Sequence, residues 1–505
     1  MRVGADAERT YTDDVGAGFH IENFGCRAAR ADGEAIASQL RAAGCVECPT
    51  VDAEVVVVNT CSVTAEADRE ARAYIRRVRR ANPAAKIVAT GCYAQRAPEE
   101  LAGLDGVSAV VGNSHKALAP EIVLGLTRER AAETRSTLIP LAALTAPMVL
   151  ADDSFAHSFL EEAQVAPGVQ TRPNLKIQEG CGNRCSFCVI PQTRGSSRSL
   201  PGDAVMKQVE GFVAAGGLEL VLSGINLGRW GRDFDPTLAA EERRNNGAPT
   251  TLASLVRRIF EQTQLTRLRL SSIEPMDWDA ELIELMAEFG DAGSPATGPR
   301  RWGRLARHAH LPLQSGSDAV LRRMHRRYRP WHYAEKAAAL VRAAGPELTL
   351  GADVMVGFPG ETDAEFEETL ELVRALPFGY LHLFPFSPRP GTRAWALHAE
   401  RPVTPQAVAE RMQALRDLGA EKMRTHRTQM IGRELEAITL HTPAALAAEG
   451  RTAALTENFI AVELHERVEA NRLVRVRANG LTPEGALDAS VFTAHSPACA
   501  AAVAV

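Results

Sequence analysis

The N-terminal part of the chain alternates apolar runs with stretches of helical periodicity. Residues 54–59 form a β-branched run that is typical of a strand buried on both faces of a parallel sheet. Residues 19–24 and 86–90 are predicted as further strands, and residues 32–43 and 65–80 as helices between the strands. Strands that alternate with helices in this way predict an α/β domain.

A longer alternation of the same kind begins near residue 175. The predicted strands are residues 175–178, 218–223, 265–271, 310–313, 349–356 and 380–384. The predicted helices are residues 203–215, 252–262, 279–288, 318–326, 332–343 and 365–375. Six such β/α units predict a partial (β/α)6 barrel, whose working face lies at the carboxyl ends of its strands.

The pattern changes once more near the end of the chain. Residues 405–430 are predicted as a helical connector, and short strands follow at residues 433–440, 451–455, 459–464 and 472–478. Such strands predict a small β-barrel of RNA-binding size. The fold class is therefore α/β, with an N-terminal domain at 1–130, a linker at 131–166, a barrel domain at 167–404, the connector at 405–430 and the small β-barrel at 431–495.

Three cysteines lie close together after the first strand of the predicted barrel. Cys181, Cys185 and Cys188 have the spacing C-x3-C-x2-C, and the aromatic Phe187 precedes the third. Three thiolates can hold three corners of an iron–sulfur cube and leave the fourth iron open for a small molecule. The alternatives are a structural zinc site that lacks one ligand and three unrelated cysteines.

Three further cysteines, Cys26, Cys61 and Cys92, each follow a predicted strand of the N-terminal domain. Ligand sites in open parallel sheets lie beyond the carboxyl ends of the strands, and neighbouring strands are about 4.8 Å apart. The three loops can therefore converge on a second small cluster. The alternative is three buried structural thiols, because free cysteine is often buried. Cys45 and Cys48 have no second pair nearby and are interpreted as incidental.

Composition and charge narrow the possible classes of protein. With 505 residues, 45% of them hydrophobic, the chain can bury several cores. A net charge of -5 gives no general attraction to nucleic acid, so RNA affinity must come from local patches. No run approaches the ~20 apolar residues of a membrane span, and the first residues have no signal-peptide core. We therefore expect a cytoplasmic protein without a membrane partner, whose reduced cysteines bind metal.

Polar segments recur at the ends of the predicted barrel strands, at residues 223–226, 271–275, 314–317 and 357–361. Their joint placement on one rim indicates a cofactor pocket. Two polar stretches, residues 232–249 and 290–307, are predicted as surface insertions. The second carries four arginines, which predict either a solvated loop or a contact with a phosphate backbone: Arg300, Arg301, Arg304 and Arg307.

Together these features resemble the methylthiotransferase family of radical S-adenosylmethionine (SAM) enzymes. The matching motifs are Asn59-Thr60-Cys61, residues 91–95 (Gly-Cys-Tyr-Ala-Gln), the loop from Gln178 to Cys188, and residues 310–317 (His-Leu-Pro-Leu-Gln-Ser-Gly-Ser), 356–362 (Val-Gly-Phe-Pro-Gly-Glu-Thr) and 387–392 (Ser-Pro-Arg-Pro-Gly-Thr). The C-terminal strands resemble a TRAM domain, an RNA-binding module. Residues 61–64, 223–228 and 272–275 are similar to the branch that acts on N6-threonylcarbamoyladenosine beside the anticodon of tRNA.

The resemblance implies cofactors, partners and site residues. It implies two 4Fe-4S clusters, one on Cys26, Cys61 and Cys92 and the other on Cys181, Cys185 and Cys188. In that superfamily the open iron binds SAM, whose reductive cleavage gives a 5'-deoxyadenosyl radical. The implied partners are a tRNA anticodon stem-loop, a reductant such as flavodoxin or ferredoxin, and a sulfur donor. The candidate SAM-pocket residues are Phe187, Gly224, Asn226, Ser272, Glu274, Gln314 and Asp353.

One position departs from the family pattern. Ala29 stands where the family usually has asparagine, three positions after its first cysteine, and the departure concerns substrate or sulfur handling near Cys26. The alternative substrates are another tRNA adenosine and an aspartate of a ribosomal protein. An alternative from a different class is a non-catalytic iron–sulfur sensor that binds RNA.

Overall fold

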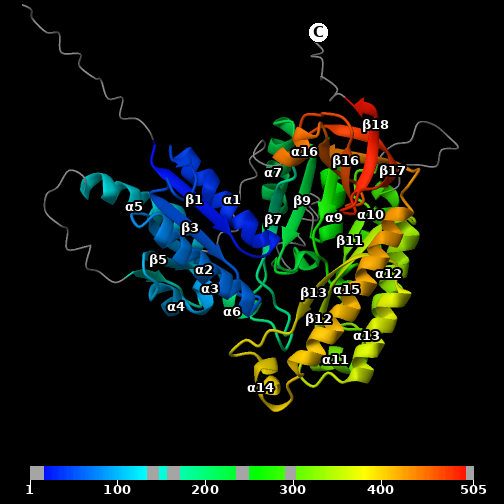
Figure 1. Cartoon of the computed structure of the whole chain (residues 1–505), viewed down its shortest axis with the longest axis horizontal. Coiled ribbons are helices and arrows are strands. Elements are labelled where there is room, and N and C mark those ends of the chain that lie inside the picture. Colours follow the sequence, from blue (N-terminus) through cyan, green and yellow to red (C-terminus); the bar gives the residue numbers. More distant parts are fainter. Residues whose placement is uncertain (1–15, 134–146, 156–170, 235–249, 291–302, 496–505) are drawn as a thin grey trace, which may run out of the picture. The chain divides into compact units, whose positions relative to one another are not determined.

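The computed structural model describes residues 16–133, 147–155, 171–234, 250–290 and 303–495 (Figure 1). The chain divides into two compact units, one built mainly from residues before 158 and the other mainly from residues after it. Within the described residues, no helix is both long enough and apolar enough to cross a membrane. Each unit is described by itself below.

The first unit contains a parallel sheet, which confirms the predicted α/β domain. In sheet order, the strands of the described residues are β2 (Val46–Glu47), β1 (Gly18–Asn23), β3 (Val55–Thr60), β4 (Lys86–Gly91), β5 (Val107–Gly112) and β6 (Met148–Leu150). The helices are α1 (Arg27–Ala42), α2 (Ala65–Ala81), α3 (Cys92–Arg96), α4 (Pro98–Ala102) and α5 (Ala119–Glu133). Val56 and Val58 of β3 pack against Ile75 and Val78 of α2, which explains the apolar run.

One part of the predicted linker belongs to this sheet instead. β6 pairs with β5 in parallel, with Ala109 opposite Met148 and Val111 opposite Leu150. The segment was expected to connect domains because periodicity weakens there and Ala, Thr and Pro recur. Its place in the sheet comes from backbone pairing over three residues, which leaves almost no pattern in the sequence.

The strands β1, β3 and β4 end side by side. Asn23 lies opposite Asn59, and Asn59 lies opposite Thr90, so the loops that follow leave the sheet at one edge. Gly91 has a φ of 103°, and a Cβ atom there would overlap the carbonyl oxygen of Thr60. Glycine is therefore required immediately before Cys92.

The second unit contains the predicted partial barrel. Its parallel strands are β7 (Asn174–Glu179), β9 (Glu219–Gly224), β10 (Arg267–Leu270), β11 (His308–His310), β12 (Thr349–Val356) and β13 (Phe378–Pro385), with β8 (Arg198–Ser199) antiparallel at the edge. The helices are α6 (Ile190–Arg194), α7 (Gly202–Ala214), α9 (Leu252–Gln262), α10 (Ala280–Gly290), α11 (Asp318–Arg323), α12 (Pro330–Ala344), α13 (Asp363–Ala375) and α14 (Arg393–Glu400). A bridge between Leu268 and Leu305 connects β10 to the chain that enters β11.

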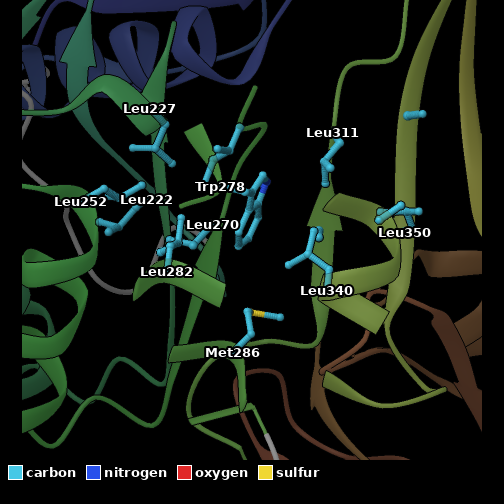
Figure 2. Packing of buried hydrophobic residues seen from close by; sticks show 14 of the residues in the cluster. Leu222, Leu227, Leu252, Leu270, Trp278, Leu282, Met286, Leu311, Leu340 and Leu350 are labelled. Atoms are coloured by element: carbon cyan, nitrogen blue, oxygen red, sulfur yellow. The ribbon is translucent and has the colours of Figure 1, made fainter. Parts of the chain in front are cut away.

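Leucines on the outer face of these strands hold the helices in place. Figure 2 shows Leu222 of β9 and Leu270 of β10 among Leu252, Leu282 and Met286 of the covering helices. All of these side chains are buried. Because apolar residues occupy the outer face of the strands, the polar residues lie on the inner face and at the strand ends.

The C-terminal part forms the predicted small β-barrel after the long helix α15 (Pro405–Thr428). In barrel order, its strands are β14 (Glu434–Thr439), β15 (Thr452–Thr456), β16 (Ala461–Leu464), β18 (Leu487–His495) and β17 (Leu473–Leu481), with α16 (Ala444–Ala448) after β14. Strand β18 was missing from the prediction, and it closes the barrel by pairing with both β16 and β17.

A buried ion network fastens this small barrel to the amino ends of β9 and β10. Arg267 contacts Glu219 at 3.3 Å and also pairs with Glu436 of β14. Arg269 lies 2.8 Å from Glu219 and donates to the carbonyl oxygen of Thr456 at 3.2 Å. Burial pushes the pKa of Glu219 up, but the charges of Arg269 and Arg267 outweigh it and lower the pKa to about 2.

Two arginines of the predicted insertion also serve the fold rather than RNA. Arg304 donates three hydrogen bonds to backbone carbonyls at and just beyond the end of α9. Arg307 pairs with Glu347 and with Glu457, at 2.6 Å from the latter. Both alternatives, the solvated loop and the phosphate contact, are therefore wrong for Arg304 and Arg307, while Arg300 and Arg301 lie outside the described residues.

We predict that Arg267→Met lowers the free energy of unfolding by about 3–5 kcal/mol, because it leaves Glu219 and Glu436 buried with one partner fewer. The measurement is denaturant unfolding at neutral pH. Ionised Glu219 stabilises the wild type above pH ~5, and this contribution is lost as the pH falls toward 2. The control is Arg322→Met, which removes an exposed pair with Asp318 and should cost no more than about 1 kcal/mol. Equal losses in the two variants would contradict the role of the network.

We predict that Gly91→Ala destabilises the N-terminal domain by more than about 1–2 kcal/mol. The left-handed backbone alone costs about that much for alanine, and the new methyl group would also overlap Thr60. Thermal unfolding measures the effect. Gly103→Ala is the matched control, since Gly103 has a φ of -74° and its nearest atom would be 3.5 Å away. A Gly91→Ala protein as stable as this control would refute the prediction.

Candidate functional site

The loop that carries Cys181, Cys185 and Cys188 follows β7 at the carboxyl end of the barrel. The backbone N–H of Cys181 donates to the carbonyl of Gly195 at 3.1 Å. Ser186, in the middle of the loop, donates from its backbone N–H to Met324 at 3.0 Å. These bonds fix the loop against two separate segments, so the three cysteines have a defined framework.

Nitrogen donors point at two of the sulfur atoms. The backbone N–H of Asn183 and the amide Nδ2 of Asn226 lie 3.4 Å and 3.5 Å from Sγ of Cys181. Nη1 of Arg326 lies 3.2 Å from Sγ of Cys185. Donors of this kind stabilise thiolates and surround the sulfur ligands of iron–sulfur clusters.

Burial disfavours the thiolate forms of Cys181 and Cys188. Burial raises the pKa of Cys188 to about 12, and it also raises the pKa of Cys181 despite the donors from Asn183 and Asn226. All three side chains nevertheless keep some exposed surface. The site therefore fits metal-bound thiolates better than free reactive cysteines.

Three thiolates are the donor set of an iron–sulfur cube with one open iron, whereas a structural Zn²⁺ ion takes four ligands.

Three of the candidate SAM-pocket residues lie beside this loop. Phe187 meets the ring of Phe358 edge-on, with centroids 6.5 Å apart. Asn226, whose Nδ2 faces Cys181, has a buried Oδ1 that no described residue hydrogen-bonds. Gly224 packs against Gln178, since a Cβ atom would lie 2.9 Å from that side chain. Gly224 therefore serves strand packing, whereas Asn226 presents a polar atom in need of a partner.

The remaining candidates lie after or within β10, β11 and β12. Ser272 is half-buried just beyond β10. Glu274 pairs with Arg326, the residue that contacts Cys185. Gln314 has a positive φ of 63° and a buried Oε1 that lacks a hydrogen-bond partner within the described residues. The carboxylate of Asp353 is bound by two histidines, which are described below.

A hollow with about 290 Å³ of empty space, including open solvent, lies beside Cys185. Its lining includes Asn183, Glu274, Arg326 and Tyr328. It brings the predicted Glu274 and the loop cysteine Cys185 to one recess at this rim.

The sequence interpretation missed several residues at this end of the barrel. Ser271 has a buried hydroxyl that makes no hydrogen bond to the described residues, like the polar atoms of Asn226 and Gln314. Arg326 was predicted to lie in a helix, but it follows α11 and contacts Cys185. A usable signal for Ser271 was its place directly after a buried strand, but nothing in the local pattern singles out Arg326.

Cys61 and Cys92 lie at the edge where β3 and β4 end, and Cys26 follows Gly25 in the chain after β1. Cys61 and Cys92 are buried, and Cys26 is exposed. Gly25, which precedes Cys26, is so close to Cys61 that a Cβ atom would stand 2.6 Å from its sulfur. Nδ2 of Asn113 donates to Sγ of Cys92 at 3.4 Å. Ala29 lies in α1, and its side chain is a methyl group.

Comparison with known proteins places this geometry in context. The model of the Uncharacterized protein family UPF0004 matches residues 18–112, and the model of the Radical SAM superfamily matches residues 175–373. The radical S-adenosylmethionine methyltransferase TsrM from Kitasatospora setae has a TM-score of 0.50 and 16% identity, over 77% of this chain and 78% of that one. This likeness concerns the fold.

Sequence relatives cover nearly the whole chain. The threonylcarbamoyladenosine tRNA methylthiotransferase MtaB from Aquifex aeolicus is 34% identical, over 90% of this chain and 98% of the relative. MtaB from Bacillus subtilis is 34% identical over 81% and 82%. The tRNA-2-methylthio-N(6)-dimethylallyladenosine synthase from Parafrankia sp. is 33% identical over 92% and 84%. The chain therefore belongs to the radical SAM methylthiotransferase family.

Proposed function

We propose that this protein replaces the C2 hydrogen of N6-threonylcarbamoyladenosine beside the anticodon of tRNA with a methylthio group. The observation that carries the proposal is the likeness to methylthiotransferases of that name across nearly their full length. The expected cytoplasmic location, the flavodoxin or ferredoxin reductant and the sulfur donor belong to the same proposal.

The target carbon explains the need for cofactors. An aromatic C–H bond at C2 of adenine is not acidic enough for a side-chain base. Two 4Fe-4S clusters and SAM, when bound, would supply the radical and sulfur chemistry that side chains lack. The protein then has to bind these groups, orient the base and keep water away.

The barrel cysteines would hold one cluster. Cys181, Cys185 and Cys188 provide three thiolates, and N–H groups of Asn226 and Arg326 stabilise their negative charge. Buried polar atoms of Asn226, Ser271 and Gln314 would serve the polar groups of SAM. Phe187 would shield the site from water. Glu274 would orient Arg326, which contacts Cys185. Ser272 is proposed as a SAM-pocket residue only because it lies on the same rim.

The N-terminal cysteines would hold the second cluster. Cys26, Cys61 and Cys92 follow strands that end at one edge, and Gly25 and Gly91 allow their loops to lie close together. Asn113 would stabilise the thiolate of Cys92. The small C-terminal barrel would bind RNA, with the modified base entering the site unstacked.

A dimethylallyladenosine substrate is the second candidate, because relatives with that activity in their names are similar to this chain at 32–33% identity. The two candidates share the cofactors and differ only in the group on N6. Mass spectrometry of tRNA nucleosides from a strain without this protein separates them. Loss of the methylthio group from threonylcarbamoyladenosine supports the proposal, and loss only from dimethylallyladenosine overturns it.

We predict that Cys92→Ala and Cys181→Ala each abolish this methylthio group in the complemented strain and each lower iron and sulfide content by about half, because each removes one ligand of a separate cluster. Cys48→Ala is the control, since its half-buried thiol belongs to neither set. Purification and iron analysis are done without oxygen. Full iron content in Cys92→Ala would refute the second cluster while leaving the first intact.

A further inference from the structure

Three strands of the barrel bring two histidines and an aspartate together. His310 ends β11, Asp353 lies in β12 and His382 lies in β13, where Asp353 and His382 are register partners. Nε2 of His310 is 3.1 Å from Oδ1 of Asp353, and Nδ1 of His382 is 3.2 Å from the same oxygen. One donor atom from each residue lies within 4.8 Å of the other two.

These separations fit a shared ion. A first-row divalent cation binds imidazole nitrogen and carboxylate oxygen at about 2.0–2.2 Å, which places neighbouring donor atoms about 2.8–3.6 Å apart across octahedral and tetrahedral geometries. The two nitrogen–oxygen distances fall in this range.

A hydrogen bond from a neighbouring side chain fixes the orientation of His310. Nδ1 of His310 hydrogen-bonds the hydroxyl of Tyr380 at 2.9 Å, so its Nε2 is turned toward Asp353. The same hydroxyl lies 2.8 Å from Nε2 of His308, which is buried. Histidines that bind metal usually have their second ring nitrogen fixed in this way.

The opposite side is open. The His382 side chain is 63% exposed, compared with 27% for Asp353 and 8% for His310. An ion can therefore enter past His382 and meet the two more rigid ligands behind it. Burial opposes ionisation of Asp353, but its hydrogen bonds to His310 and His382 outweigh burial and lower its pKa.

We propose that His310, Asp353 and His382 form a binding site for a divalent first-row transition-metal ion. Two imidazoles and one carboxylate favour zinc, iron or cobalt over magnesium and calcium, which prefer oxygen ligands alone. Three protein ligands leave coordination positions open for water or for an oxygen atom of a substrate. The proposal does not depend on the reaction proposed above.

The test is zinc binding to the full chain with its clusters reconstituted, so that cluster cysteines do not compete. After chelator treatment, Zn²⁺ is titrated by calorimetry, and zinc per chain is measured after gel filtration. We expect one zinc per chain in the wild type. His382→Ala and Asp353→Asn should weaken binding at least ~10-fold, and Tyr380→Phe by about tenfold, since it removes only the outer hydrogen bond.

The matched control is His465→Ala, which removes an isolated histidine–aspartate pair with Asp488 and should leave zinc binding unchanged. Iron content and circular dichroism show whether each variant is folded. His382→Ala changes an exposed side chain, so its result can be interpreted even if Asp353→Asn fails to fold. Absence of zinc from the wild type, or wild-type affinity in His382→Ala, would show that the group is only a hydrogen-bonded cluster.

Discussion

Parallel pairing of strands is the constraint on which the rest of this structure depends. In both units, strands that run in one direction end at a common edge, and the residues that follow them are brought together although they are far apart in sequence. Cys61 and Cys92 follow adjacent strands of one sheet, and the loop of Cys181 and the side chain of Asn226 follow adjacent strands of the other. A shift of register by one residue would separate both pairs.

Much of this arrangement could be predicted from the sequence because buried parallel strands have a strong signature. The apolar runs at β3 and β12, and the regular helix spacing at α2 and α9, predicted those elements closely. Both sets of cysteines were predicted as cluster ligands, one from its local spacing and the other from its repeated place after strands, and this role stays a prediction. The family resemblance agreed with these features and with the order of the domains.

Other features depend on partners that the local pattern does not contain. β6 and β18 exist because they complete a sheet and a barrel. Arg304 and Arg307 looked like solvent-facing charge, yet their guanidinium groups bind carbonyls and carboxylates from distant segments. His382 alternates with Leu381 and Leu383 in β13, which could have marked an inward polar position. That His310 and Asp353 lie close to His382 could be known only from the order of the strands.

The ion network at Glu219 and Arg267 has a geometric consequence for any RNA that the small barrel holds. That network lies where β9 and β10 begin, whereas the cysteine loop lies where β7 ends. A six-residue strand such as β9 is about 20 Å long. The docked barrel therefore stands about one strand length from the cysteine loop, and a ligand that touched both would have to span that distance.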